Sequence, residues 1–191
     1  TRTFGKGIVV SGFEHPSVQR PLERLAKQGY DVTVVAPRAD GTLDIAAMLE
    51  RVDKNTILVA CMMVNNEIGT RNDVERLAAE VKRRNSRTIV HVDAVQGFGK
   101  AKIYPKKMGI DLMSASGHKI HGPKGIGLMY IGERVKIQPI IYGGGQQMNL
   151  RSGTDNVPGA AGMAKAAELL YAHYDDDVEN LYRLKRRFMD G

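Results

Sequence analysis

The stretch NTILVACMMV, residues 55–64, contains the longest apolar run in the chain. Its length suits one strand, and because ILVACMMV is apolar at every position, both faces of that strand are expected to be buried. The polar segment NNEIGT (65–70) ends the run. DVERLAAEVKRRN (73–85) then repeats apolar residues at helical spacing, which predicts an amphipathic helix. A buried strand followed by such a helix is a building unit of parallel α/β sheets.

The same alternation continues on both sides of this unit. Apolar and β-branched stretches predict further strands at 6–13, 30–37, 87–95, 110–116 and 125–131. Helical spacing predicts helices at 17–29, 42–52 and from about Val157 onward. We therefore expect an α/β fold with three layers, α/β/α, around a mostly parallel mixed sheet. No repeat, low-complexity tract or linker divides the 191 residues, so one domain is expected.

The composition is that of a globular protein with an excess of basic over acidic residues. The 28 lysines and arginines exceed the 21 acidic residues, which gives a net charge of +7. Aromatic residues make up 6%, with no tryptophan, and most basic residues are scattered, so nucleic-acid binding is disfavoured. No apolar run is long enough to span a bilayer, and no membrane partner is expected. The single cysteine, Cys61, lies in the longest apolar run, which predicts a buried core thiol and favours a cytoplasmic location.

Polar side chains follow three of the predicted strands. They occur at Asn65-Asn66-Glu67, from Asp93 to Gln96, and from Ser116 to Lys119. Open α/β sheets bind ligands beyond the carboxyl ends of their strands, near a change in strand order. These three segments are therefore the candidate functional site.

Asp93 ends an apolar strand, where an unpaired carboxylate is costly to bury. It could cap the turn or helix that follows. It could instead keep a heterocyclic nitrogen of a ligand protonated, with Gln96 beside it on the next turn. The residues alone leave both roles open.

Lys119 lies in SASGHKIHGPKG (114–125), among serine, glycine and histidine residues. An ordinary surface lysine is one interpretation. A lysine close to other cations can instead form a Schiff base, and Ser116, His118 and a glycine-rich turn could bind a phosphate. His118 and His121 have metal-ligand spacing, but no cysteine or carboxylate close in sequence completes the set, so no metal site is expected. GPKGIG fails the P-loop pattern, because glycine follows its lysine.

Two further segments contain candidate ligand contacts. FEHPSV places His15 between a strand and a helix that starts with proline, where its ring could stack on a flat cofactor or cap the helix. In YGGGQQMNLRSGTDNVPG (142–159), three donors suit an anion: Arg151, Ser152 and Thr154.

Five segments together resemble the class V, fold type I pyridoxal-phosphate enzymes, and within them the NifS-like cysteine desulfurases. The segments are FEHPSV, NNEIGT, HVDAVQ, SGHKIHGPKGIG and GGGQQMNLRSGTDNVPG, in the family's order. The separation of Asp93 and Lys119, 119 − 93 = 26 positions, agrees as well. The resemblance extends over nearly the whole chain and implies that residues 1–191 are part of the pyridoxal-phosphate-binding large domain of a transferase.

The resemblance implies roles for the matching residues. Lys119 would be the catalytic lysine that forms a Schiff base with pyridoxal 5'-phosphate, and Asp93 would pair with the pyridine nitrogen. Gln96 would contact the phenolic oxygen, and Asn66 would lie near that oxygen and the substrate carboxylate. His15 would stack on the cofactor ring and take part in catalysis.

The phosphate contacts and the reaction are also implied. Ser116 and His118 would help to hold the phosphate, and Thr154 would reach a phosphate that in this family is usually the partner subunit's, which implies a homodimer. The reaction would convert L-cysteine to L-alanine and leave a persulfide on a separate cysteine. The resemblance also implies that the persulfide sulfur would pass to a sulfur-acceptor protein. That sulfur would serve iron–sulfur cluster biogenesis or another sulfur-transfer pathway.

The chain also departs from the family's complete pattern. Cys61 does not match the persulfide cysteine, and the resemblance implies that an N-terminal segment and the small C-terminal domain are absent. Our hypothesis is that this stretch alone is inactive and binds the cofactor poorly or not at all. Two alternatives stay open: another class V enzyme, such as an aminotransferase or selenocysteine lyase, and a cofactor-free scaffold or interaction domain.

Overall fold

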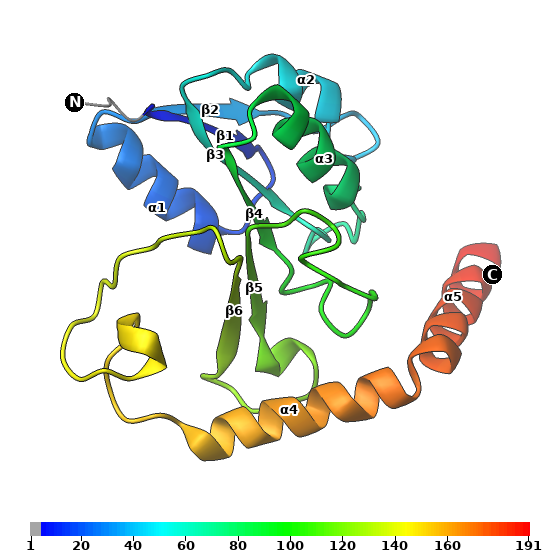
Figure 1. The fold of residues 1–191 in the computed structure, drawn as a ribbon. Coiled ribbons are helices and arrows are strands. Elements are labelled where there is room, and N and C mark those ends of the chain that lie inside the picture. The colour runs from blue at the N-terminus through cyan, green and yellow to red at the C-terminus, as the bar shows by residue number, and fades with distance from the viewer. Residues whose placement is uncertain (1–4) are drawn as a thin grey trace. The chain divides into compact units, whose positions relative to one another are not determined.

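The computed structural model describes residues 5–191, and Figure 1 shows its helices and strands. The strands of the described part are β1 (Gly7–Ser11), β2 (Asp31–Val35), β3 (Thr56–Met62), β4 (Ile89–Asp93), β5 (Leu112–Ser116) and β6 (Gly127–Ile131). The helices are α1 (Pro16–Lys27), α2 (Ile45–Glu50), α3 (Val74–Arg84), α4 (Val157–Ala172) and α5 (Tyr174–Asp190), with short 3-10 turns η1 (Gly117–Lys119) and η2 (Gln147–Asn149). The predicted alternation of strands and helices is confirmed.

The strands form one mostly parallel sheet in the order β2-β1-β3-β4-β5-β6. The pairs β1–β2, β1–β3, β3–β4 and β4–β5 are all parallel. β6 runs against β5, because Gly132 N donates to Asp111 O (2.7 Å) while Gly117 N donates to Ile126 O (3.0 Å). The structure therefore confirms the expected α/β fold with a mostly parallel mixed sheet.

The strand order changes direction at β1. The chain passes from β1 outward to β2 and then returns to the other side of β1 to form β3. In open α/β sheets the carboxyl ends of the two strands at such a change flank the usual ligand position. The loops after β1 and β3, residues 12–15 and 63–66, therefore hold the first candidate contacts.

Contacts within the chain divide it into two compact units. The first unit contains the residues up to Gln96 together with 103–115 and 129–135, and the second contains 97–102, 116–128 and 136–191. In the first unit, α1 covers one face of β1 to β3, and α2 and α3 cover the other (Figure 1). This arrangement gives the three layers predicted from the sequence.

Apolar side chains fill both interlayer spaces of the first unit. Leu22 of α1 packs with Ile8 and Val10 of β1 on one face. On the other face, α3 contacts β3 and β4 and contributes Leu77 and Val81, which are fully buried. β1 and β3 are covered on both faces, which explains why their sequences are continuous apolar runs.

In the second unit, Tyr171 of α4 fixes the turn at residues 97–102. Its hydroxyl donates to Ala101 O (3.2 Å) and accepts from Gly99 N (3.2 Å). Gly99 has a φ of +78°, and a Cβ there would lie 2.8 Å from Ile120 Cγ2, so only glycine fits without a shift. The turn thus packs against the residue that follows Lys119. None of the helices among residues 5–191 is long and apolar enough to cross a membrane.

Candidate functional site

Asp93, the last residue of β4, is buried, with 6% of its surface exposed. Its Oδ1 accepts a hydrogen bond from Val95 N (2.9 Å), so the carboxylate caps the turn that follows, which confirms the capping interpretation. No donor among the described residues reaches Oδ2. Asp93 is therefore suited to both predicted roles: Oδ1 holds the turn, and Oδ2 can accept from a ligand N–H. Gln96 is half-buried three positions later.

Glu14 is a second buried carboxyl close to Asp93, and the sequence analysis missed it. It follows β1 and is 3% exposed. Its Oε1 accepts from Met62 N (2.7 Å) and from the Ser11 hydroxyl, whereas Oε2 has no partner among residues 5–191. Burial raises the pKa of Glu14 to about 7, and the charge of Asp93 adds to the increase. An acidic residue directly after a strand predicted to be buried was the available signal.

His15, adjacent to Glu14, caps helix α1. Its Nδ1 lies 3.1 Å from Ser17 N and 2.7 Å from the Ser17 hydroxyl, and the ring is exposed. The capping interpretation is therefore confirmed, and it fixes the ring at the carboxyl end of β1. Stacking on a cofactor stays a prediction.

The two asparagines after β3 have different roles. Asn65 is buried, donates to Phe13 O (3.2 Å), and accepts from Glu67 N (2.8 Å) and Ile68 N (3.0 Å). It thereby ties the loop after β3 to the loop after β1. Asn66 is exposed, and its Nδ2 donates to Glu67 Oε1 (2.7 Å). Asn66, the residue matched to the family's contact, is thus the accessible amide of the pair.

In the second unit, β5 leads directly into the η1 turn that carries Lys119. Gly117 N donates to Ile126 O (3.0 Å), and Gly117 O accepts from Gly122 N (2.9 Å), so the turn closes on this glycine. A Cβ at residue 117 would lie 2.8 Å from Ile126 Cγ2 and 3.1 Å from Pro123 O. Glycine is therefore required here by the close approach of the chain, and it holds the following residues in a defined turn.

The side chains of this turn are accessible. Lys119 and His118 are exposed, and Ser116 is half-buried. Burial and the charge of Lys119 lower the pKa of Lys100, which belongs to the same unit. Lys119 therefore has a cationic neighbour, as nucleophilic lysines often do. Across residues 5–191, no group of three or more possible metal ligands occurs.

The segment 142–159 folds largely on its own polar groups. The Ser152 hydroxyl donates to Gly144 O (2.8 Å), and the Arg151 guanidinium donates to Ser152 O (2.8 Å). Thr154 is exposed. Two of the three predicted anion donors are thus engaged in holding the loop, which leaves Thr154 as the accessible hydroxyl.

Cys61 in β3 is fully buried, which confirms the predicted core thiol. Burial raises its pKa well above the usual range, and the charges of Glu14 and Asp93 add to the increase. A thiol in this state is a poor nucleophile.

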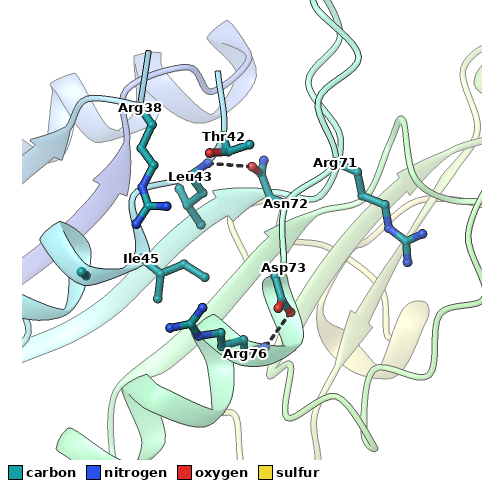
Figure 2. Close-up of a pocket in the computed structure, with 9 residues that line it drawn as sticks. Arg38, Thr42, Leu43, Ile45, Arg71, Asn72, Asp73 and Arg76 are labelled. Carbon is teal, nitrogen blue, oxygen red and sulfur yellow. Dashed lines mark hydrogen bonds between the residues drawn. The ribbon is translucent and has the colours of Figure 1, made fainter. Parts of the chain in front are cut away.

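A separate hollow lies between the loops before α2 and α3, and Figure 2 shows its lining. Asn72 accepts there from Leu43 N (3.0 Å), and Asp73 caps α3 by accepting from Arg76 N (3.0 Å). None of the predicted site residues lines it. Its polar contacts serve the two helix starts, and we assign it no role.

The fold and these strand ends define an α/β domain whose candidate ligand contacts follow the carboxyl ends of its strands. The family model for aminotransferase class-V matches residues 3–188, and the chain belongs to this family, as the sequence motifs suggested. The family is pyridoxal-phosphate-dependent. The residues present fit that group, because Asp93 is a buried residue whose Oδ2 accepts from no donor among residues 5–191, and Lys119 offers an accessible amine in a fixed turn.

Individual relatives support a more specific likeness. The chain is 38% identical over 187 residues to "Cysteine desulfurase IscS 1" of Archaeoglobus fulgidus. The aligned residues make up 98% of this chain and 48% of that protein. It is 41% identical over 180 residues to a cysteine desulfurase of Nostoc, covering 94% of this chain and 44% of that protein. A solved NifS-like protein superimposes with a TM-score of 0.95 at 38% identity, over 99% of this chain and 52% of that one. The resemblance to NifS-like proteins is confirmed, and the chain spans about half the length of the curated relatives it matches.

Proposed function

We propose that this chain is the cofactor-binding part of a pyridoxal-phosphate-dependent cysteine desulfurase, which converts L-cysteine to L-alanine and passes on the sulfur as a persulfide. The observation that carries the proposal is Asp93, buried at the end of β4 with Oδ2 unpaired. A buried carboxylate of this kind suits a protonated ring nitrogen. The similarity to several proteins named cysteine desulfurase supports the choice of reaction.

The bound cofactor supplies an aldehyde that bonds to amines and a ring that accepts electrons from the substrate Cα. Lys119 would bond to the aldehyde and, once displaced by the substrate amine, would move a proton at Cα. Asp93 would hold the proton on the ring nitrogen. Gln96 and Asn66 would orient the phenolic oxygen, and His15 would stack on the ring.

Anion binding and sulfur transfer complete the proposal. The donors for the phosphate would be Ser116, His118 and Thr154, with Thr154 acting across a homodimer. Cys61 is the only cysteine of the chain and is buried, so we do not propose it as the persulfide cysteine. For the same reason we expect the 191-residue chain alone not to release sulfide from cysteine. We also propose that the sulfur passes to an acceptor protein for iron–sulfur cluster biogenesis, and that the protein is cytoplasmic.

Cofactor attachment is tested in a protein that contains this chain together with the remaining half of its relatives' length, because this stretch alone is expected to bind the cofactor poorly. The protein is incubated with pyridoxal phosphate and reduced with borohydride, and the adduct is mapped by mass spectrometry. We expect one adduct, on Lys119, which Lys119→Ala abolishes. The matched control is Lys124→Ala, an exposed lysine of the same glycine-rich stretch, which should keep the adduct. Labelling spread over several exposed lysines would contradict the assignment and favour a cofactor-free domain.

The reaction is tested in a protein that contains this chain together with the remaining half of its relatives' length. Alanine and sulfide produced from L-cysteine would support desulfuration. An adduct on Lys119 accompanied by transamination, or by activity on selenocysteine alone, would instead identify another class V enzyme.

A further inference from the structure

Glu14 replaces a backbone acceptor at the carboxyl end of the sheet. The pairing of β1 with β3 extends to Val10 and Ala60, and beyond Ser11 the chain turns away. The N–H of Met62, two positions further along β3, therefore has no β1 carbonyl opposite it. The Glu14 carboxyl fills this position at 2.7 Å. Hydrogen bonding to Met62 explains why an acceptor is needed at this point.

The next N–H of the chain connects to Asp93. Met63 N donates to the Asp93 backbone oxygen at 2.8 Å, after Met62 N has donated to Glu14. Successive N–H groups of an extended chain point to opposite sides. Glu14 and Asp93 therefore flank the end of β3, and both lie next to the change in strand order where ligands bind.

Hydrogen bonding does not explain why the acceptor is an acid. A glutamine amide oxygen could accept from Met62 N without the cost of burying a carboxyl. Glu14 instead has a buried oxygen without a partner and a pKa raised to about 7. Burying a second acid beside Asp93 costs folding stability. The presence of a carboxyl rather than an amide at position 14 must therefore be explained by the charge that a carboxyl can carry.

The charges around the pair favour a ligand that brings a cation. Among the described residues, no lysine, arginine or histidine forms an ion pair with Glu14 or Asp93. Two titratable groups respond to the charges of this pair, and burial is the largest influence on each. Burial lowers the pKa of His91 against the opposing effect of Asp93, and burial raises the pKa of the Cys61 thiol. Burial thus favours the neutral form of both groups. Two buried acids without a counter-ion are suited to a cation delivered by the ligand.

We propose that Glu14 is a positioning residue that acts through Asp93 and strengthens the preference of the site for a protonated ring nitrogen. The inference rests on the proposed function. A cation bound at Asp93 favours the ionised form of Glu14, so the Glu14 proton leaves to solvent when the ring binds. The same carboxyl, through Met62 and Ser11, holds the end of β1 from which His15 projects.

The main test uses pyridoxal phosphate labelled with ¹⁵N in the ring and records the protonation of that nitrogen against pH by NMR. Glu14→Gln keeps the acceptor for Met62 N but removes the charge. We expect it to lower the midpoint for loss of the ring proton by about one pH unit, equivalent to a tenfold weaker hold on the proton. The control Glu23→Gln makes the same substitution at an exposed acid of α1, and should leave the midpoint unchanged. An unchanged midpoint in Glu14→Gln would overturn the inference.

A second measurement uses the unloaded chain and does not depend on the folding of a Glu14 variant. Asp93→Asn should lower the titration midpoint of the Glu14 carboxyl, followed by ¹³C NMR, from about 7, because the charge of Asp93 contributes to the increase. A midpoint that does not move would show that the two acids are uncoupled and would overturn the inference. Absence of the Lys119 adduct in a protein that contains this chain together with the remaining half of its relatives' length would overturn the proposed function, and this inference with it. A Lys119 adduct with an unchanged ring midpoint would overturn this inference alone.

Discussion

Replacing Glu14 with glutamine should change how the stability of the unloaded chain depends on pH. The pKa of Glu14 is raised from 4.5 to about 7, chiefly by burial. At about 1.36 kcal/mol for each pH unit, the difference of 7 − 4.5 = 2.5 corresponds to about 3 kcal/mol. Because the folded state keeps its proton longer than the unfolded state, this contribution is fully present below pH 4.5 and is lost as the pH rises to 7.

The assay is urea unfolding of the chain and of Glu14→Gln at intervals from pH 5 to pH 8. Glutamine does not titrate, so the free energy of unfolding of the unsubstituted chain, minus that of the variant, should fall by roughly 2–3 kcal/mol over this range. His91 acts in the opposite direction, because burial lowers its pKa and its contribution is lost as the pH falls. That effect is common to both proteins and cancels in the difference. A difference that stays flat from pH 5 to pH 8 would refute the account of Glu14 as a buried acid.

Three further substitutions test the packing and hydrogen bonding of the two units. Leu77→Ala removes a fully buried side chain of α3 and should lower the free energy of unfolding by about 2–5 kcal/mol, whereas Leu181→Ala on the exposed surface of α5 should change it by less than about 0.5 kcal/mol. Asp111→Asn weakens a part-buried pair with Lys82 (2.6 Å) and should cost about 1–3 kcal/mol in the same urea assay. Tyr171→Phe removes the hydroxyl that holds the turn at 97–102 and should cost about 1 kcal/mol, with faster amide hydrogen exchange in that turn.

Each of these expectations has a result that would contradict it. Equal effects of Leu77→Ala and Leu181→Ala would mean that α3 is not packed on the sheet. If Asp111→Asn costs nothing, the ion pair with Lys82 does not hold the two segments together in solution. Unchanged exchange at residues 97–102 in Tyr171→Phe would show that the turn is stable without the tyrosine hydroxyl.

The strands were predictable because burial leaves a direct trace in the sequence. β3 is covered on both faces, so residues 57–64 are apolar without interruption, and the predicted strand is confirmed. The helix at α3 was equally clear, since one face alone is buried. Asp93 and Lys119 stood out because polar residues that follow apolar strands are unusual. Their roles toward a cofactor stay predictions.

Other parts of the site depend on contacts distant in sequence. The bond from Met62 N to Glu14 joins residues 48 positions apart, and no local pattern indicates it. The sequence also could not show which asparagine of the pair 65–66 is structural, because the buried contact of Asn65 with Phe13 O spans 52 positions. Such contacts form only when the whole chain has folded and brought distant segments together, so a local sequence pattern cannot predict them.

The bond between Glu14 and Met62 N also affects how this part of the sheet can change in evolution. Bonds between backbone atoms exist whatever the side chains are, so apart from proline a substitution cannot delete one directly. The last bond on this side of β3 is an exception, because its acceptor is a side chain and a change in one codon removes it. The edge of the sheet nearest the change in strand order can therefore be loosened or tightened by mutation without altering a strand. Related proteins could differ in the rigidity of this edge while keeping the same fold.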